Sequence, residues 1–128
     1  MKTSYFLIFL AIYSFLAGGV MLFNATGALQ NYGIQPVDSY HIAIIEFLGL
    51  TNIGLGLNAF LFRNANADSA RNIFISTAFL TIGSFLKGCY DVMLLGVPAN
   101  NFFWIDMSFR LLVGLVCVYF VFRSTKTA

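Results

Sequence analysis

The chain has 128 residues, of which 59% are hydrophobic and only 9% are charged. Disordered chains are polar and rich in charge, so this composition excludes a disordered protein and argues against an ordinary soluble domain. The net charge is +2 and the basic residues are scattered singly, which argues against a nucleic-acid partner. The remaining class is a polytopic integral membrane protein.

Four apolar stretches are each long enough to cross the hydrocarbon core, which takes about 20 helical residues. They cover residues 4–23, 42–62, 72–95 and 102–122. The connections between them are short and carry the polar, Gly and Pro residues that are typical of turns. The sequence therefore predicts an all-α protein, in which four transmembrane helices form one bundle and a single integral membrane domain spans residues 1–128.

The first stretch also has features of a secretory signal peptide. Lys2 precedes the apolar segment Phe6–Leu16, and small residues follow at positions 17–19. The apolar run continues through Phe23, however, which favours a retained transmembrane helix.

The Lys and Arg residues outside the four stretches predict the orientation. With four spans, both termini and the second connection lie on one side of the membrane, and that side holds Lys2, Arg63, Arg71, Arg123 and Lys126. The first and third connections hold no Lys or Arg. By the positive-inside rule both termini are expected in the cytoplasm. With no recognisable eukaryotic targeting signal, we expect a prokaryotic inner membrane.

Ionisable residues within the spans are the main candidate site. They are Glu46, Lys87, Asp91, Asp106 and Arg110. Each costs about 2.5–3.5 kcal/mol in hydrocarbon, so such residues usually face the bundle interior and pair with one another. Counting 1.5 Å per residue from the helix ends places all of them in the outer half of the membrane. The sequence therefore predicts one polar cluster, with either a ligand-binding or a structural role.

The spacing of these residues predicts their contacts. Lys87 with Asp91, and Asp106 with Arg110, are four residues apart and share one face of their helix. If the last two helices are antiparallel neighbours, Asp91 lies opposite Asp106 and Lys87 opposite Arg110. Pairing across the helices is then expected, such as Lys87 with Asp106. Arg110 could pair with Asp91 or Glu46, and the one excess negative charge requires a proton or a cation.

Small and polar residues recur at helical spacing in every stretch and predict the inward faces, because small residues let membrane helices approach closely. The four stripes are Ala11, Ser14, Gly18, Met21; Glu46, Gly49, Asn52, Gly56, Ala59; Thr77, Thr81, Ser84, Gly88, Asp91; and Asp106, Arg110, Val113, Cys117.

Three further polar residues, His41, Ser84 and Tyr90, are possible accessories to the cluster. His41 stands at a helix start, where a solvated residue near the helix cap is the favoured interpretation. Cys89 and Cys117 are roughly 14 Å apart in depth by residue counting, too far for a disulfide, so we predict free thiols. A single histidine and the lack of a CxxC pair give no reason to expect a metal or a cofactor.

Three functional hypotheses are compatible with this pattern. In the first, the outward-facing cluster binds a small or lipid-like ligand, or the protein serves as a membrane module for a partner. In the second, the charges only fix helix register in a structural accessory subunit or a homo-oligomer. In the third, a membrane enzyme or proton-coupled transporter uses Glu46, Asp91 or Asp106. No set of nucleophile, base and acid is visible, which favours a protein that is not an enzyme.

The third and fourth stretches also resemble a known family. Gly83, Lys87, Asp91, Gly96 and Pro98 combine an intramembrane basic residue, a following acid and a Gly-x-Pro turn. With Asn31-Tyr32-Gly33 after the first stretch, this pattern is similar to that of small DoxX-like membrane proteins. The family would have an Arg where Lys87 stands. The resemblance implies a four-helix membrane fold, and some members are associated with quinone-linked oxidoreductase systems.

Overall fold

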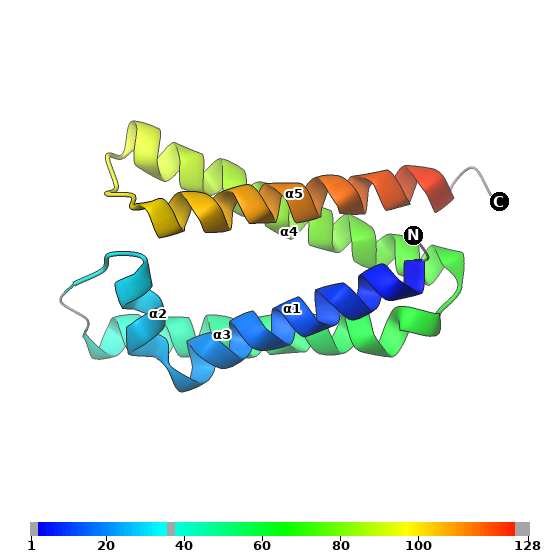
Figure 1. The fold of residues 1–128 in the computed structure, drawn as a ribbon, viewed down its shortest axis with the longest axis horizontal. Coiled ribbons are helices and arrows are strands. Elements are labelled where there is room, and N and C mark those ends of the chain that lie inside the picture. Colours follow the sequence, from blue (N-terminus) through cyan, green and yellow to red (C-terminus); the bar gives the residue numbers. More distant parts are fainter. Residues whose placement is uncertain (1–2, 36–37, 125–128) are drawn as a thin grey trace. The chain divides into compact units, whose positions relative to one another are not determined.

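The structure is a computed structural model that describes residues 3–35 and 38–124. Every regular element in these ranges is helical: α1 (Thr3–Phe23), α2 (Ala25–Asn31), α3 (Ser39–Leu61), the 3-10 turn η1 (Phe62–Asn64), α4 (Ala67–Leu94) and α5 (Asn101–Ser124) (Figure 1). The four long helices are each long and apolar enough to cross a membrane. The all-α class and the four predicted spans are therefore confirmed, and they indicate an integral membrane protein.

The first connection contains a short helix, α2, that the sequence analysis did not predict. The Asn24 side-chain oxygen accepts a hydrogen bond from the Gly27 N–H at 3.2 Å and caps its start. At its end, Gly33 has a φ of 82°, which favours glycine, and the Ile34 N–H reaches back to the Leu29 carbonyl at 3.1 Å. A helix of seven residues is too short for apolar periodicity to reveal.

Two long helices begin earlier than predicted, and an acidic or amide side chain caps each of them. The Asn66 Oδ1 accepts from the Ser69 N–H at 2.9 Å, so α4 begins at Ala67 and includes Arg71, which was assigned to a loop. The Asp38 Oδ1 caps α3 in the same way through the His41 N–H at 2.9 Å. Hydropathy alone placed the boundaries where the residues become apolar, whereas capping residues set where the helices start.

The chain divides into two compact units, residues 1–65 and residues 66–128. In the first, α1 and α3 run antiparallel and pack on each other through small residues (Figure 1). A Cβ atom built on Gly18 would lie 2.6 Å from the Gly49 carbonyl oxygen, and one on Gly49 would lie 2.8 Å from the Gly18 carbonyl oxygen. Glycine at both positions lets the two backbones approach closely, as in other membrane helix pairs.

The second unit is the hairpin of α4 and α5. A Cβ atom on Gly88 would lie 2.8 Å from the Met107 sulfur and 3.0 Å from the Phe103 ring. Farther along the hairpin, the Phe74 and Phe120 rings stack with centroids 5.2 Å apart. Glycine beside large side chains at one end and stacked rings at the other hold the two helices together.

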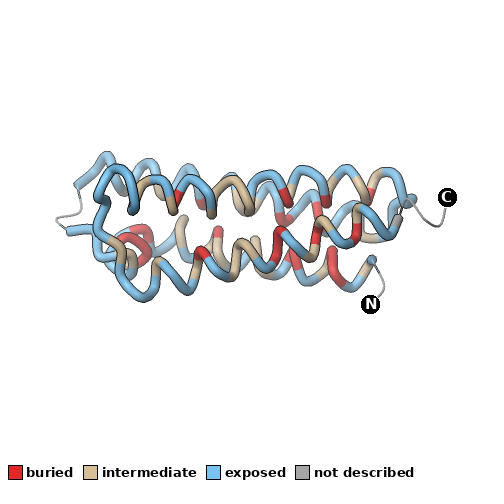
Figure 2. Tube along the Cα trace, turned by 90° about the horizontal axis from the view of Figure 1, so that it is seen from above, coloured by how far each residue is buried: buried red, intermediate tan, exposed pale blue. Residues whose placement is uncertain are grey.

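Most of the surface of each long helix is exposed, as the tube in Figure 2 shows, and only 17% to 28% of each apolar span is buried. The predicted stripes agree well with this pattern, because their members are buried or half-buried with one exception, Glu46, which is exposed. Many of the exposed side chains are large and apolar, which suits a lipid environment. That the two units form one four-helix bundle and a single membrane domain stays a prediction.

Candidate functional site

The first ion pair of the candidate site lies on α4. The Lys87 ammonium contacts the Asp91 carboxylate one turn later, and it also lies 5.6 Å from the centre of the Tyr90 ring. The Lys87 side chain is 66% exposed and that of Asp91 is 28% exposed. The ion pair within the helix that the spacing predicted is present, and Tyr90 lies beside it.

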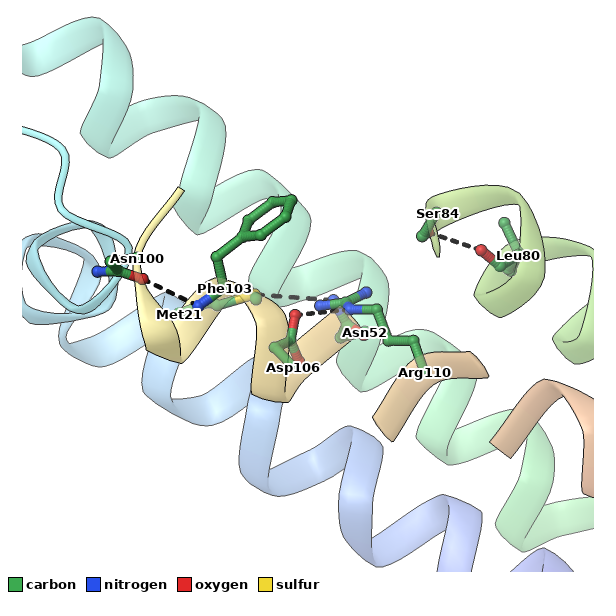
Figure 3. A network of polar contacts seen from close by, with 8 residues as sticks. All are labelled: Met21, Asn52, Leu80, Ser84, Asn100, Phe103, Asp106 and Arg110. Atoms are coloured by element: carbon green, nitrogen blue, oxygen red, sulfur yellow. Dashed lines mark hydrogen bonds and ion pairs between the residues drawn. The ribbon is translucent and has the colours of Figure 1, made fainter. Parts of the chain in front are cut away.

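The second ion pair lies on α5. The Arg110 Nε donates to the Asp106 Oδ2 at 2.7 Å, and Figure 3 shows the guanidinium turned toward the carboxylate one turn earlier. These side chains are 22% and 16% exposed, so this pair is better covered than the pair on α4. Short, charge-assisted hydrogen bonds of this kind are about twice as strong as neutral ones.

Both ion pairs lie on the same flank of the α4–α5 hairpin. Lys87 immediately precedes Gly88, and Asp106 immediately precedes Met107, the residue that Gly88 packs against. Asp91 and Arg110 each follow these packed residues by three positions. When two helices pack antiparallel, residues at the same sequence offset from the two contact residues lie on the same side of the pair. The flank thus carries two positive and two negative charges.

Two glycine contacts describe the register of the hairpin: Gly88 lies against Met107, and Gly114 lies against Thr81 and Ile82. These contacts place Lys87 level with the part of α5 between Asp106 and Arg110, within about a turn of either residue. Pairing across α4 and α5 stays a prediction, since the described contacts of Lys87 are within its own helix.

A hydrogen bond in the third connection closes the end of α4. Gly96 has a φ of 68°, and the Val97 N–H donates to the Asp91 carbonyl at 3.0 Å. Gly96 in the left-handed region and this hydrogen bond close the end of α4, a common way for a helix to terminate. The Gly96-x-Pro98 pattern indicated a turn, but the length of the loop alone could not reveal this hydrogen bond.

The other predicted site residues have local partners or lie on the first unit. The Ser84 hydroxyl donates to the Leu80 carbonyl at 2.6 Å within α4 (Figure 3). Glu46 lies on α3 with an exposed side chain, and no hydrogen bond or ion pair joins that side chain to a residue that the structure describes. Its membership of the charged cluster stays a prediction from the sequence.

His41 lies in the first turn of α3, beside the residue that caps the helix. Its Nδ1 is 2.9 Å from the Asp38 Oδ1, and both side chains are about half exposed. The hydrogen bond from the His41 backbone N–H, with smaller contributions from the His41 side chain, lowers the pKa of the Asp38 carboxyl. The geometry supports the interpretation of His41 as a residue near the helix cap.

Both cysteines are free, as predicted, and the Cys117 side chain is fully buried. Within residues 3–35 and 38–124, no group of three or more His, Cys, Asp or Glu side chains could hold a metal ion. What the site offers chemically is therefore charge and hydrogen bonding from Lys87, Asp91, Asp106 and Arg110.

Comparisons with protein-family models, with curated proteins and with solved structures found no match to this chain.

Proposed function

We propose that this protein is a small inner-membrane protein that binds a small or lipid-like ligand at the charged flank of α4 and α5. The observation that carries the proposal is the placement of two ion pairs on one flank of two membrane-spanning helices. Ionisable residues in a span are costly, and they commonly mark binding sites or ion pathways. The flank presents both a cation and an anion, which suits a polar or zwitterionic group.

Native mass spectrometry of protein extracted in mild detergent tests this proposal. We expect a bound small molecule or lipid in the wild type and its loss in Lys87→Met and Arg110→Met. Arg63→Met is the matched control, because Arg63 lies in η1 and its guanidinium contacts the Phe60 ring and carbonyl, outside the charged flank. Ligand retained equally in all variants would refute the proposal.

A structural role is the second candidate, because each cation already has an acid of its own helix as a partner. Buried ion pairs can fix helix register without any activity. In that case Lys87→Met and Arg110→Met would lower yield and thermal stability, and no ligand would be found in the wild type. A protein partner or a defined oligomer in the same spectra would support the role of a membrane module.

We propose further that both termini lie in the cytoplasm and that the charged flank opens to the outer side. Three of the supporting residues, Arg63, Arg71 and Arg123, are in the described ranges, whereas Lys2 and Lys126 lie outside them. Labelling intact cells with a membrane-impermeant maleimide tests the orientation. In a variant without Cys89 and Cys117, Ala99→Cys should react from outside, and Asp68→Cys only after the cells are permeabilised.

Membership of the DoxX-like family is also proposed. It is supported by Gly83, Lys87 and Asp91, which succeed one another at four-residue intervals on α4, and by the turn at Gly96 and Pro98 that follows. A quinone would then be one ligand to seek in the mass spectra. If the spectra show another bound molecule and no quinone, the association with quinones would be contradicted. The proposed site would be unaffected.

A further inference from the structure

The two ion pairs differ in how much of them other parts of the chain cover. The Lys87 side chain is 66% exposed, whereas Arg110 and Asp106 are 22% and 16% exposed. Lys87 lies about 10 Å from the end of α4 by helical rise, close to the level where hydrocarbon meets headgroups. An exposed ion pair at that depth is costly unless a polar group covers it.

One turn below Lys87, at Gly83, the surface of α4 carries no side chain. A Cβ atom built on Gly83 would meet nothing within 4 Å. Gly83 shares its face of α4 with the exposed side chains of Leu80, Lys87 and Tyr90, since residues at these spacings lie above one another on a helix. The face thus has an apolar part around Leu80 and Gly83, and a charged part directly above it.

The charges on this face are complementary to one kind of lipid. Lys87 can donate to a phosphate, and Asp91 can accept from a primary ammonium. An anionic headgroup without an amine would meet the Asp91 carboxylate unfavourably, and a trimethylammonium group has no N–H to donate. The apolar part below favours a molecule with acyl chains over a free phosphate.

Resting on the function proposed above, we infer that Lys87 and Asp91 hold the headgroup of a zwitterionic phospholipid with a primary amine, with an acyl chain over Gly83. Phosphatidylethanolamine is the probe that represents this chemistry. Its phosphate and ammonium would extend the Lys87–Asp91 pair into a neutral set of four charges, and Tyr90 would line the side of the site.

Native mass spectrometry of delipidated protein, titrated with lipids of identical acyl chains, tests the inference. The headgroups to compare are phosphatidylethanolamine, phosphatidylcholine and phosphatidylglycerol. We expect the first to bind about five- to tenfold more tightly than the other two, the net effect of one hydrogen bond that remains partly exposed to solvent. Asp91→Asn should reduce this preference for the primary amine, because a neutral amide oxygen accepts a weaker hydrogen bond than a carboxylate.

Two glycine variants separate the site from general lipid binding. Gly83→Leu fills the proposed position of the acyl chain and should weaken binding of phosphatidylethanolamine. Gly54→Leu is the matched control, because Gly54 lies in α3 and is equally open, with nothing within 4 Å of a built Cβ atom. Both variants keep the ion pair on α4, and at either position a Cβ atom meets nothing within 4 Å.

The possible outcomes distinguish this inference from the proposed function. Equal affinity for the three lipids, or equal weakening by Gly83→Leu and Gly54→Leu, would overturn the lipid assignment. If extracted wild-type protein still carries another ligand that Lys87→Met removes, the proposed function stands while the lipid assignment fails. A preference for phosphatidylethanolamine that Asp91→Asn reduces, together with weaker binding in Gly83→Leu than in Gly54→Leu, would support the assignment.

Discussion

Gly18 on α1 and Gly49 on α3 approach each other so closely that neither position has room for a side chain. A Cβ atom on either residue would lie 2.6 to 2.8 Å from the carbonyl oxygen of the other. Such a separation is below any normal contact, and the opposing atom belongs to the backbone, so a rotamer change cannot relieve it. Together the two glycines determine how close the helices of the first unit come.

The first prediction concerns this contact. Gly18→Ala should lower the free energy of unfolding by about 1–3 kcal/mol, the usual cost of overpacking, because the two backbones must separate. Thermal unfolding in detergent measures the effect. Gly19→Ala is the matched control, since a Cβ atom there meets nothing within 4 Å, and it should be neutral or slightly stabilising. Equal stability of the two variants would contradict the close approach.

The second prediction concerns the ion pair on α5. Arg110→Met removes the cation that lies 2.7 Å from Asp106, and it should cost on the order of 2 kcal/mol, between the values for exposed and buried pairs. The double variant Arg110→Met with Asp106→Asn should be more stable than Arg110→Met alone, because no uncompensated charge remains. Chemical denaturation of the wild type, both single variants and the double variant gives the coupling. Additive losses would show that the pair is not coupled.

The third prediction is a pH dependence at the start of α3. Because the pKa of Asp38 is lowered in the folded state, the carboxylate stabilises the helix start at neutral pH. This stabilisation should be lost as the pH falls through the lowered pKa, below the ordinary range of an aspartate. Hydrogen-exchange protection of the His41 amide measures it. Asp38→Asn keeps an oxygen that can cap the helix but cannot titrate there, so its protection should not change over the same pH range.

The fourth prediction concerns the two thiols. Cys89 is half-buried, and the Cys117 side chain is fully buried in the described structure. A small maleimide should therefore modify Cys89 in the folded protein and Cys117 only after denaturation. Cys89→Ser and Cys117→Ala identify the modified residue by mass. Rapid modification of Cys117 under native conditions would mean that the helix surface around it opens readily.

Hydropathy and spacing predicted the parts of this structure that repeat over several turns. The four spans and the ion pairs within α4 and α5 follow from long apolar runs and from residues four positions apart. Single hydrogen bonds determined the features that the sequence analysis missed. Asn66 starts α4 before the apolar run begins, and the Val97–Asp91 hydrogen bond closes its end. Glu46 shares the helical spacing of its stripe, with Gly49 one turn later, yet its side chain is exposed.

The unequal lengths of the helices affect how the protein responds to its membrane. α4 has 28 residues and α1 has 21, which correspond to rises of about 42 Å and about 32 Å. A single bilayer matches α1 without adjustment, whereas α4 must tilt or extend beyond the hydrocarbon. A thicker bilayer would therefore cost little at α4, which would need less tilt. The same bilayer would be too thick for α1 to span without adjustment. Hydrophobic mismatch would act mainly on the first unit, and the charged flank on α4 would keep access to the headgroups over a range of bilayer thicknesses.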